Sequence, residues 1–270
     1  MSDTDTDHPE IGKWDPGLTE RVIGILRPFV KRYFRSEVHG LKNIPRAGGA
    51  LVVSNHSGGL FPMDVPIFAV DFYQEFGYDR PIYTLSHDLI FTGPTGDFFV
   101  RLGFIRANPQ NAAESLRGGG LVVVFPGGDY DVYRPTVWEN VVDFGGRTGY
   151  VRSAIEAEVP IVPMVSIGGQ ETQLYLTRGT WLAQRLGPIA RAARTKILPI
   201  SFGFPFGLSV VIPPNLPLPA KIVTEVLEPI DIIAQFGENP DIAAVDAHVR
   251  EVMQRALDRL ARKRRLPILG

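Results

Sequence analysis

The sequence contains no cysteine, which excludes a disulfide framework, a thiolate zinc site and a cysteine nucleophile. It also lacks any run of about 20 apolar residues free of helix breakers, so no ordinary transmembrane helix is expected. Residues 1–9 are polar and acidic, without the basic start and apolar centre of a signal peptide. The net charge of −1 provides no overall positive field for nucleic acid. These absences favour a globular protein that works without thiol chemistry.

What the chain does have is enough apolar sequence for a sizeable core, at 44% of its 270 residues. Short β-branched runs, bounded by Gly, Pro or His, alternate with stretches of helical spacing. The predicted strands are 51–54, 82–86, 121–125 and 161–165, and the predicted helices are 63–76, 112–117 and 147–157. This alternation predicts a single α/β domain with a mainly parallel central sheet flanked by helices. In such sheets the polar chemistry collects at the carboxyl ends of the strands.

The chain divides into three predicted parts: a mobile tail at 1–16, an amphipathic helix at 17–40 and the main domain at 41–270. Between Leu18 and Phe34, apolar residues recur at helical spacing and are interleaved with Arg and Lys. Such a basic amphipathic helix either packs on the main domain or lies on an anionic membrane surface. The two arrangements are compatible, because one helix can do both with different parts of its surface.

Residues 197–220 carry no charge and contain six prolines, which exclude a regular helix through the stretch. Within it, larger side chains alternate with smaller residues at Phe202, Phe204, Phe206 and Leu208. One interpretation is a buried strand with irregular ends, and the other is an apolar wall that meets acyl chains or a bilayer. The preceding residues, 181–196, hold four basic and no acidic side chains, which suits anionic headgroups.

Of the five histidines, none pairs with another at the spacing of metal ligands, and only His56 and His87 end predicted strands. Gly58 and Gly59 follow His56 directly, so the backbone there can turn sharply and admit a substrate. Asp64 lies at the predicted start of the next helix, where its carboxylate can accept from the imidazole. Without a Gly-x-Ser-x-Gly elbow or a cysteine, this pair suits direct attack by a substrate hydroxyl. The alternative is a histidine with a purely structural role.

A second polar segment, Phe-Pro-Gly-Gly-Asp at 125–129, follows another predicted strand. Its backbone N–H groups can hold a phosphate or a developing oxyanion, although such a segment can also be only a turn. Arg134, Arg147 and Arg152 follow within a short stretch and favour an anionic substrate.

Taken together, these residues resemble the phospholipid/glycerol acyltransferase superfamily, which includes the lysophosphatidic acid acyltransferases. Four ordered blocks carry the resemblance: Asn55-His56-Ser57 with Asp64, Gly103-Phe104-Ile105-Arg106, Phe125-Pro126-Gly127-Gly128-Asp129, and Val159-Pro160-Ile161-Val162-Pro163-Met164. The segment Phe144-Gly145-Gly146-Arg147-Thr148-Gly149 is similar to one between the last two blocks. Order and spacing cover roughly residues 40–230.

The resemblance implies that the main domain transfers an acyl chain from an acyl thioester, on coenzyme A or acyl carrier protein, to a glycerolipid hydroxyl. It implies His56 as general base and Asp64 as its partner for catalysis, and for substrate binding Arg106, Phe125, Pro126, Gly127, Gly128, Asp129, Arg134 and Arg147. It further implies no covalent enzyme intermediate, no cofactor and no metal. The expected acceptor is a lysophospholipid or a related glycerolipid, and the expected location is peripheral, on the cytoplasmic side of a membrane.

The sequence departs from the family pattern at two places. Seven residues separate His56 from Asp64 where the family usually has four, which leaves Asp88 as the reserve partner of the imidazole. The third block has Gly127 where Glu is usual, and the second lacks a clear Asp-Arg pair. Both changes are similar to the branch that includes mono- and diacylglycerol acyltransferase-like proteins.

Two other functions compete with acyl transfer. In a lipid or thioester hydrolase, His56 would activate water instead of an alcohol. A non-catalytic peripheral lipid-binding protein would use only the basic helix and the apolar stretch.

Overall fold

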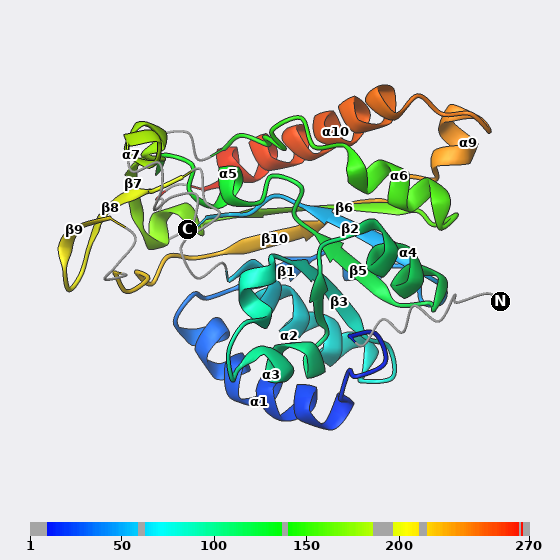
Figure 1. Cartoon of the computed structure of the whole chain (residues 1–270), viewed down its shortest axis with the longest axis horizontal. Helices are drawn as coiled ribbons and strands as arrows, with labels where there is room; N and C mark the ends of the chain where they lie inside the picture. The colour runs from blue at the N-terminus through cyan, green and yellow to red at the C-terminus, as the bar shows by residue number, and fades with distance from the viewer. Residues whose placement is uncertain are drawn as a thin grey trace.

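The computed structural model describes residues 10–58, 63–136, 140–185, 197–210, 215–264 and 266. At its centre lies a seven-stranded sheet with the order β1-β10-β6-β2-β5-β3-β4 (Figure 1). The strands are β1 (Glu37–His39), β2 (Ala50–Ser54), β3 (Ile82–Ser86), β4 (Phe104–Arg106), β5 (Leu121–Val124), β6 (Ile161–Ile167) and β10 (Val223–Val226). Neighbouring strands are parallel except β10 and β6. The predicted α/β class with a mainly parallel sheet is confirmed.

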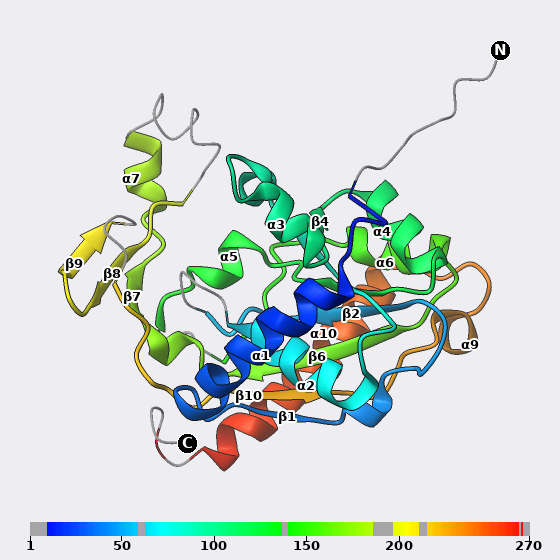
Figure 2. The ribbon, with the colours of Figure 1, turned by 90° about the horizontal axis from the view of Figure 1, so that it is seen from below.

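Helices cover both faces of this sheet (Figures 1 and 2). One face carries α4 (Pro109–Arg117), α6 (Gly149–Glu156) and α10 (Ile242–Lys263), and the other carries α1 (Pro16–Arg32) and α2 (Asp64–Phe76). Shorter helices are α3 (Gly96–Arg101), α5 (Asp129–Val132), α7 (Thr180–Arg185) and α9 (Ile232–Phe236). None of the helices in the described part of the chain combines the length and apolar character needed to cross a bilayer.

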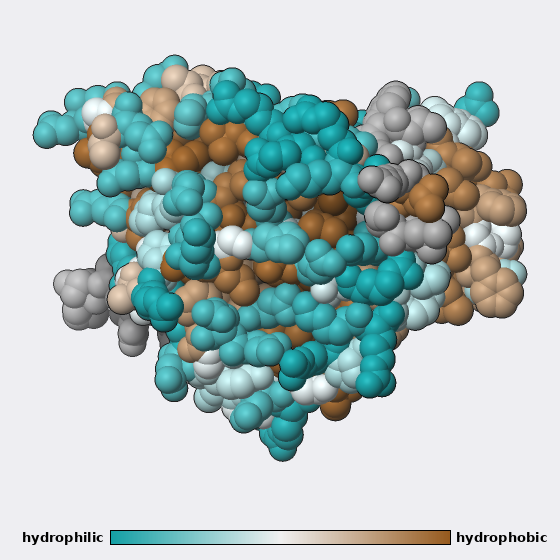
Figure 3. All heavy atoms as spheres, turned by 180° about the vertical axis from the view of Figure 1, so that it is seen from behind, coloured by the Kyte–Doolittle hydropathy of each residue, from teal (hydrophilic) through white to brown (hydrophobic). Residues whose placement is uncertain are grey.

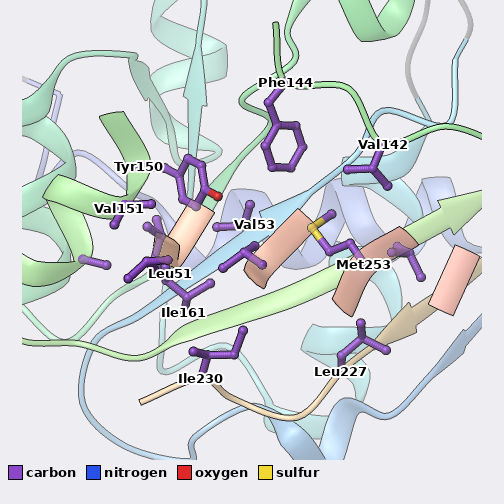
Figure 4. Close-up of a cluster of buried hydrophobic side chains, with 14 of the residues drawn as sticks. Leu51, Val53, Val142, Phe144, Tyr150, Val151, Ile161, Leu227, Ile230 and Met253 are labelled. Atoms are coloured by element: carbon purple, nitrogen blue, oxygen red, sulfur yellow. The ribbon is translucent and has the colours of Figure 1, made fainter. Parts of the chain in front are cut away.

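The central strand β2 is buried on both sides, which explains its unbroken apolar run. Leu51 and Val53 point into the cluster beneath α6 and α10 (Figure 4), whereas Ala50 and Val52 join the cluster under α1 and α2. Alternate residues of one strand therefore supply both cores.

A second, three-stranded antiparallel sheet projects from one end of the molecule (Figures 1 and 2). It consists of β7 (Leu174–Thr177), β8 (Ile200–Gly203) and β9 (Gly207–Val210), in that order. The sequence pattern did not separate this unit from the main sheet. Two of its strands, β8 and β9, come from the stretch 197–220, for which the sequence allowed either a buried strand or an apolar wall.

The N-terminal segment is more ordered than the predicted tail at 1–16. Residues 1–9 lie outside the described part, but Glu10 is buried, and Trp14 packs against the core and stacks on Tyr73 with ring centroids 6.4 Å apart. The predicted helix at 17–40 begins at Pro16, capped by Asp15, and ends at Arg32, after which residues 37–39 form β1. The partners of this segment lie far away in sequence, so local composition alone indicated a tail.

Leu51→Ala should lower the free energy of unfolding by about 2–5 kcal/mol, because truncating a fully buried side chain loses its transfer energy and leaves a cavity. Urea denaturation measures this change. As a control, Leu174→Ala on the exposed face of β7 should stay within about 0.5 kcal/mol of the wild type. Equal midpoints for Leu51→Ala and the wild type would contradict the central place of β2 in the core.

Candidate active site

Three neighbouring strands, β5, β2 and β6, end at the same edge of the main sheet. His56 follows β2, the segment 125–128 follows β5, and residues 168–170 follow β6. Since these strands are parallel, the three segments meet at their carboxyl ends, where α/β proteins place their sites.

His56 lies beside the carboxylate of Asp64, with its Nδ1 at 3.3 Å from Asp64 Oδ2. Asp64 opens α2, and its side chain is fully buried. The same carboxylate accepts from the backbone N–H of Ser57 at 3.1 Å and from the Ser57 hydroxyl at 2.5 Å. These bonds fix the carboxylate in position to orient the imidazole. The reserve candidate, Asp88, is 62% exposed and faces Arg106 instead.

Between His56 and Asp64, residues 59–62 lie outside the described part of the structure, and Gly58 is described. Gly58 has φ of +106°, and a Cβ added there would lie 2.5 Å from Cγ of Gln170. Both features require glycine, because a side chain at this position would be strained and would collide with the segment after β6.

The ring of Phe125 stacks on the imidazole of His56, with centroids 4.0 Å apart and planes 8° from parallel. The His56 side chain is 12% exposed, so a small part of it remains accessible. Phe125, predicted as a substrate-binding residue, thus contacts the candidate base directly. Phe125 covers one face of the imidazole ring, and Asp64 contacts its Nδ1. Nε2 is therefore the ring nitrogen that can interact with a substrate.

A buried ion pair supports the backbone of His56. Asp131 in α5 accepts from the His56 N–H at 2.6 Å and from Arg134 at 2.6 Å. Gln170, with its amide oxygen turned toward the guanidinium, accepts from Arg134 Nε at 3.0 Å. Burial raises the pKa of the Asp131 carboxyl to about 6, against the lowering effect of Arg134. Burial likewise lowers the pKa of Arg134, and the Asp131 carboxylate opposes that shift.

Asp131 and Gln170 are site residues that the sequence reasoning missed, and Asn55 was named only as part of the first family block, without a role. Asn55 accepts from the N–H of Ser166 and donates to its carbonyl oxygen, both at 2.9 Å, and so ties the end of β2 to β6. For Asp131, its spacing of three residues from Arg134 was the available signal. For Gln170 no local signal exists, because its partner Arg134 lies in another segment of the chain.

The loop after β5 is braced by Arg147, whose side chain is exposed and whose NH1 donates to the carbonyl oxygens of Pro126 at 3.1 Å and Gly127 at 2.7 Å. A Cβ added to Gly127 would lie 2.6 Å from Cβ of Asp131 and 2.7 Å from the backbone oxygen of Asp143. The glutamate usual in the family therefore does not fit here without a shift of the loop. The side chain of Asp131 occupies the space that a glutamate side chain at position 127 would need.

The remaining predicted residues lie in different surroundings. Arg106 ends the edge strand β4, where it pairs with Glu10 and its guanidinium lies 4.9 Å over the ring of Phe91. Arg134 is almost fully buried in its pair with Asp131. Asp129 begins α5, but its side chain lies outside the described part of the structure. A contact of these three with substrate stays a prediction.

Comparison with known proteins identifies the family to which the chain belongs. The family model described as Acyltransferase matches residues 35–167, which include His56, Asp64 and the loop after β5. An uncharacterized protein of Mycobacterium tuberculosis is 33% identical over 263 residues, covering 95% of this chain and 70% of that protein. The human protein named DGAT1/2-independent enzyme synthesizing storage lipids is 28% identical over 236 residues, covering 83% of this chain and 65% of that protein.

Among solved structures, the fold is similar to that of the 1-acyl-sn-glycerophosphate (LPA) acyltransferase PlsC from Thermotoga maritima. The TM-score is 0.55 at 20% sequence identity, covering 90% of this chain and 81% of the other. The chain therefore belongs to the acyltransferase family, and the family predicted from its motifs is confirmed.

Arg134→Met should destabilise the protein more at high pH than at low pH. The change removes the cation that lowers the pKa of Asp131, so the folded-state pKa rises further above its ordinary value of 3.8. The folded protein then binds a proton more tightly than the unfolded chain, and stability falls as pH rises between the two pKa values. We expect a loss of about 3–5 kcal/mol at about pH 8, and a smaller loss at about pH 5, in urea denaturation.

The control for this prediction is Arg255→Met, which breaks an exposed pair with Glu251 on α10. Its loss should not exceed about 1 kcal/mol at either pH. The same loss for Arg134→Met at both pH values would contradict the role assigned to the Asp131 carboxylate.

Proposed function

We propose that the protein transfers an acyl chain from acyl-CoA or acyl-ACP to a hydroxyl of a lysophospholipid or a related glycerolipid, with His56 as general base. The observation that carries this proposal is the geometry around His56. Its Nδ1 faces a fully buried carboxylate at 3.3 Å, its ring is clamped by Phe125, and its other nitrogen is left for a substrate proton.

The reaction follows from these positions. Nε2 of neutral His56 takes the proton of the acceptor hydroxyl as its oxygen attacks the thioester carbonyl carbon. Asp64 accepts the Nδ1 proton in a hydrogen bond, which fixes the tautomer and stabilises the imidazolium. When the tetrahedral intermediate collapses, the C–S bond breaks and the thiolate leaves, taking the proton from Nε2. The acyl chain moves in one transfer, without a covalent enzyme intermediate.

The oxyanion of this intermediate needs a donor at the edge of the loop after β5. The N–H of Gly128 donates to the carbonyl oxygen of Phe125 at 3.1 Å, so we assign the donor role to the N–H of Gly127. Arg147 holds this loop through two carbonyls and carries an exposed positive charge beside it. That charge suits the phosphate of an acceptor such as 1-acylglycerol 3-phosphate.

The substrates also imply the setting of the reaction. Glycerolipid acceptors reside in membranes, whereas acyl-CoA and acyl-ACP are dissolved, so the enzyme works where the two meet. We propose that it is attached peripherally, on the cytoplasmic side of a membrane, and serves phospholipid or storage-lipid synthesis. The similarity to enzymes named for storage-lipid synthesis supports an acceptor of the glycerolipid class.

His56→Ala should lower kcat by about a hundredfold to ten-thousandfold, because it removes the general base. Thiol release from acyl-CoA, measured with lysophosphatidic acid and with monoacylglycerol as acceptors, gives the rate. His87→Ala, which changes the histidine that follows β3, is the control and should stay near the wild type. Near-normal thiol release in His56→Ala would sink the proposal, and free fatty acid formed without acceptor would assign a hydrolase instead.

Asp64→Asn should reduce kcat by a similar order, about a hundredfold or more, with a smaller effect on KM, because the amide no longer stabilises the imidazolium. Asp88→Asn is the matched control, since that carboxylate faces Arg106 and not His56. If Asp88→Asn lost more activity than Asp64→Asn, the pairing assigned to His56 would be incorrect.

A further inference from the structure

The small sheet formed by β7, β8 and β9 has its polar side chains inside and its apolar side chains outside. Across the inner face, Tyr175, Ser201 and Ser209 lie opposite one another in register, and all three are buried. Across the outer face the neighbouring row is Leu174, Phe202 and Leu208. A surface sheet of a water-soluble protein normally has the reverse arrangement.

The outer face consists of Leu174, Leu176, Phe202, Leu208 and Val210, which are between 41% and 64% exposed. Two further side chains, Phe204 (68% exposed) and Phe206 (54%), stand at the turn between β8 and β9. Figure 3 shows hydrophobic side chains gathered at this end of the molecule. Contiguous apolar surface of this kind marks a binding surface, because scattered exposed residues would not line up on one face.

The inner face explains how the sheet stays folded without burying these side chains. The hydroxyls of Ser201 and Ser209 lie 3.1 Å apart, and Asn215 donates to the carbonyl oxygen of Gly207 at 2.9 Å. On β7, the Tyr175 hydroxyl donates to Gln173, and the Tyr175 N–H donates to Thr136 at 2.9 Å. Hydrogen bonds hold the sheet, so its apolar side chains remain available for another partner.

The stretch of sequence that contains this face carries charge of one sign. Residues 172–224 contain six Arg or Lys and no Asp or Glu, in a chain whose net charge is −1. In α7, directly after β7, Trp181 is half exposed and the guanidinium of Arg185 lies 5.7 Å over its ring. Tryptophan and arginine side by side are typical of the boundary between acyl chains and headgroups, and basic residues attract anionic lipid.

The sheet also lies next to the candidate active site. The ring of Tyr175 packs edge-on against Tyr133 at 5.7 Å, and Arg178 after β7 donates to the carbonyl oxygen of Tyr130 at 3.0 Å. Both partners flank Asp131, which binds the backbone of His56. A lipid surface in contact with the outer face would therefore hold its glycerolipids close to the catalytic histidine.

We propose that the outer face, with the Phe204–Phe206 turn at its tip, docks onto the surface of a bilayer that contains anionic lipid. This inference deepens the proposed function, on which it rests for the lipid nature of the substrate. The turn side chains enter the boundary between headgroups and acyl chains, while Arg185 on α7 meets the phosphates. A second copy of this chain fits less well, because its basic segment would face an identical one across a symmetric interface.

The test compares the binding of full-length protein to vesicles in sedimentation, without acyl donor. Wild type should bind vesicles of phosphatidylcholine with phosphatidylglycerol and bind phosphatidylcholine alone more weakly. The double variant Phe204→Asp/Phe206→Asp should bind at least about tenfold more weakly, because two apolar anchors are lost and two negative charges are gained. Its circular dichroism and Tm should match the wild type, since both side chains are exposed.

The control is Ile233→Asp, which places one negative charge at an exposed apolar position on α9, at the opposite end of the molecule (Figure 1). It should leave vesicle binding unchanged. A second comparison is Ile25→Asp on α1, where Ile25 is the most exposed of that helix's apolar residues. Unchanged binding of the double variant, or loss only with Ile25→Asp, would overturn the proposal. The proposal would also be overturned if the wild type formed a dimer in analytical ultracentrifugation, the double variant were monomeric, and neither protein bound to vesicles.

Failure of this inference can be told apart from failure of the proposed function. His56→Ala should bind vesicles like the wild type, because His56 is not one of the residues that form the outer face. The double variant should transfer acyl groups to a dispersed, short-chain lysophospholipid at the wild-type rate, but transfer them more slowly to the same headgroup presented in vesicles. Vesicle binding without any acyl transfer by wild type would refute the function and leave the docking surface standing.

Discussion

The pairing of β2 with β5 on one side and β6 on the other is the constraint on which the rest of the structure depends. The register sets Val53 opposite both Val124 and Pro163, so β2 and β5 end at nearly the same level, while β6 continues for three residues past Met164, the partner of Ser54. His56, the loop after β5 and the turn after β6 then meet without further adjustment. A slip of one residue would exchange the two faces of β2, and burial on both faces forbids it.

Once the strands have set the position of His56, short polar contacts set its orientation. Its backbone N–H is held by Asp131, its Nδ1 by Asp64 and its ring face by Phe125. Two buried carboxylates near one histidine would repel each other and would be unfavourable if left without partners. Arg134 neutralises one, and the N–H and hydroxyl of Ser57 solvate the other. The result is an imidazole whose position is fixed before substrate binds, which general-base catalysis requires.

The sequence allowed the sheet class, the central strands and the pair of His56 and Asp64 to be predicted, because each depends on local pattern or on a short ordered motif. It did not reveal Asp131 as the support of His56, since that contact joins residues 75 positions apart. For the same reason the sequence did not show that Arg106 pairs with Glu10 or that Arg134 pairs with Asp131. The alternation of large and small side chains at 202–208 likewise indicated a strand, but it did not predict which face of that strand is buried.

The apolar face of the strand at 202–208 is exposed, and the physical reason for this exposure bears on function. An enzyme that draws its substrate from a membrane needs apolar surface in water, yet such surface tends to bury itself during folding. Here hydroxyls, an asparagine and a tyrosine on the inner face form hydrogen bonds within the small sheet and the residues next to it, so the sheet is held together without hiding its phenylalanines and leucines. Polar side chains inside and apolar side chains outside let the sheet fold and still leave apolar surface for lipid. Strand β7, which carries part of the apolar face, also packs on the segment that contains Asp131, and Asp131 binds the backbone of His56, the proposed base.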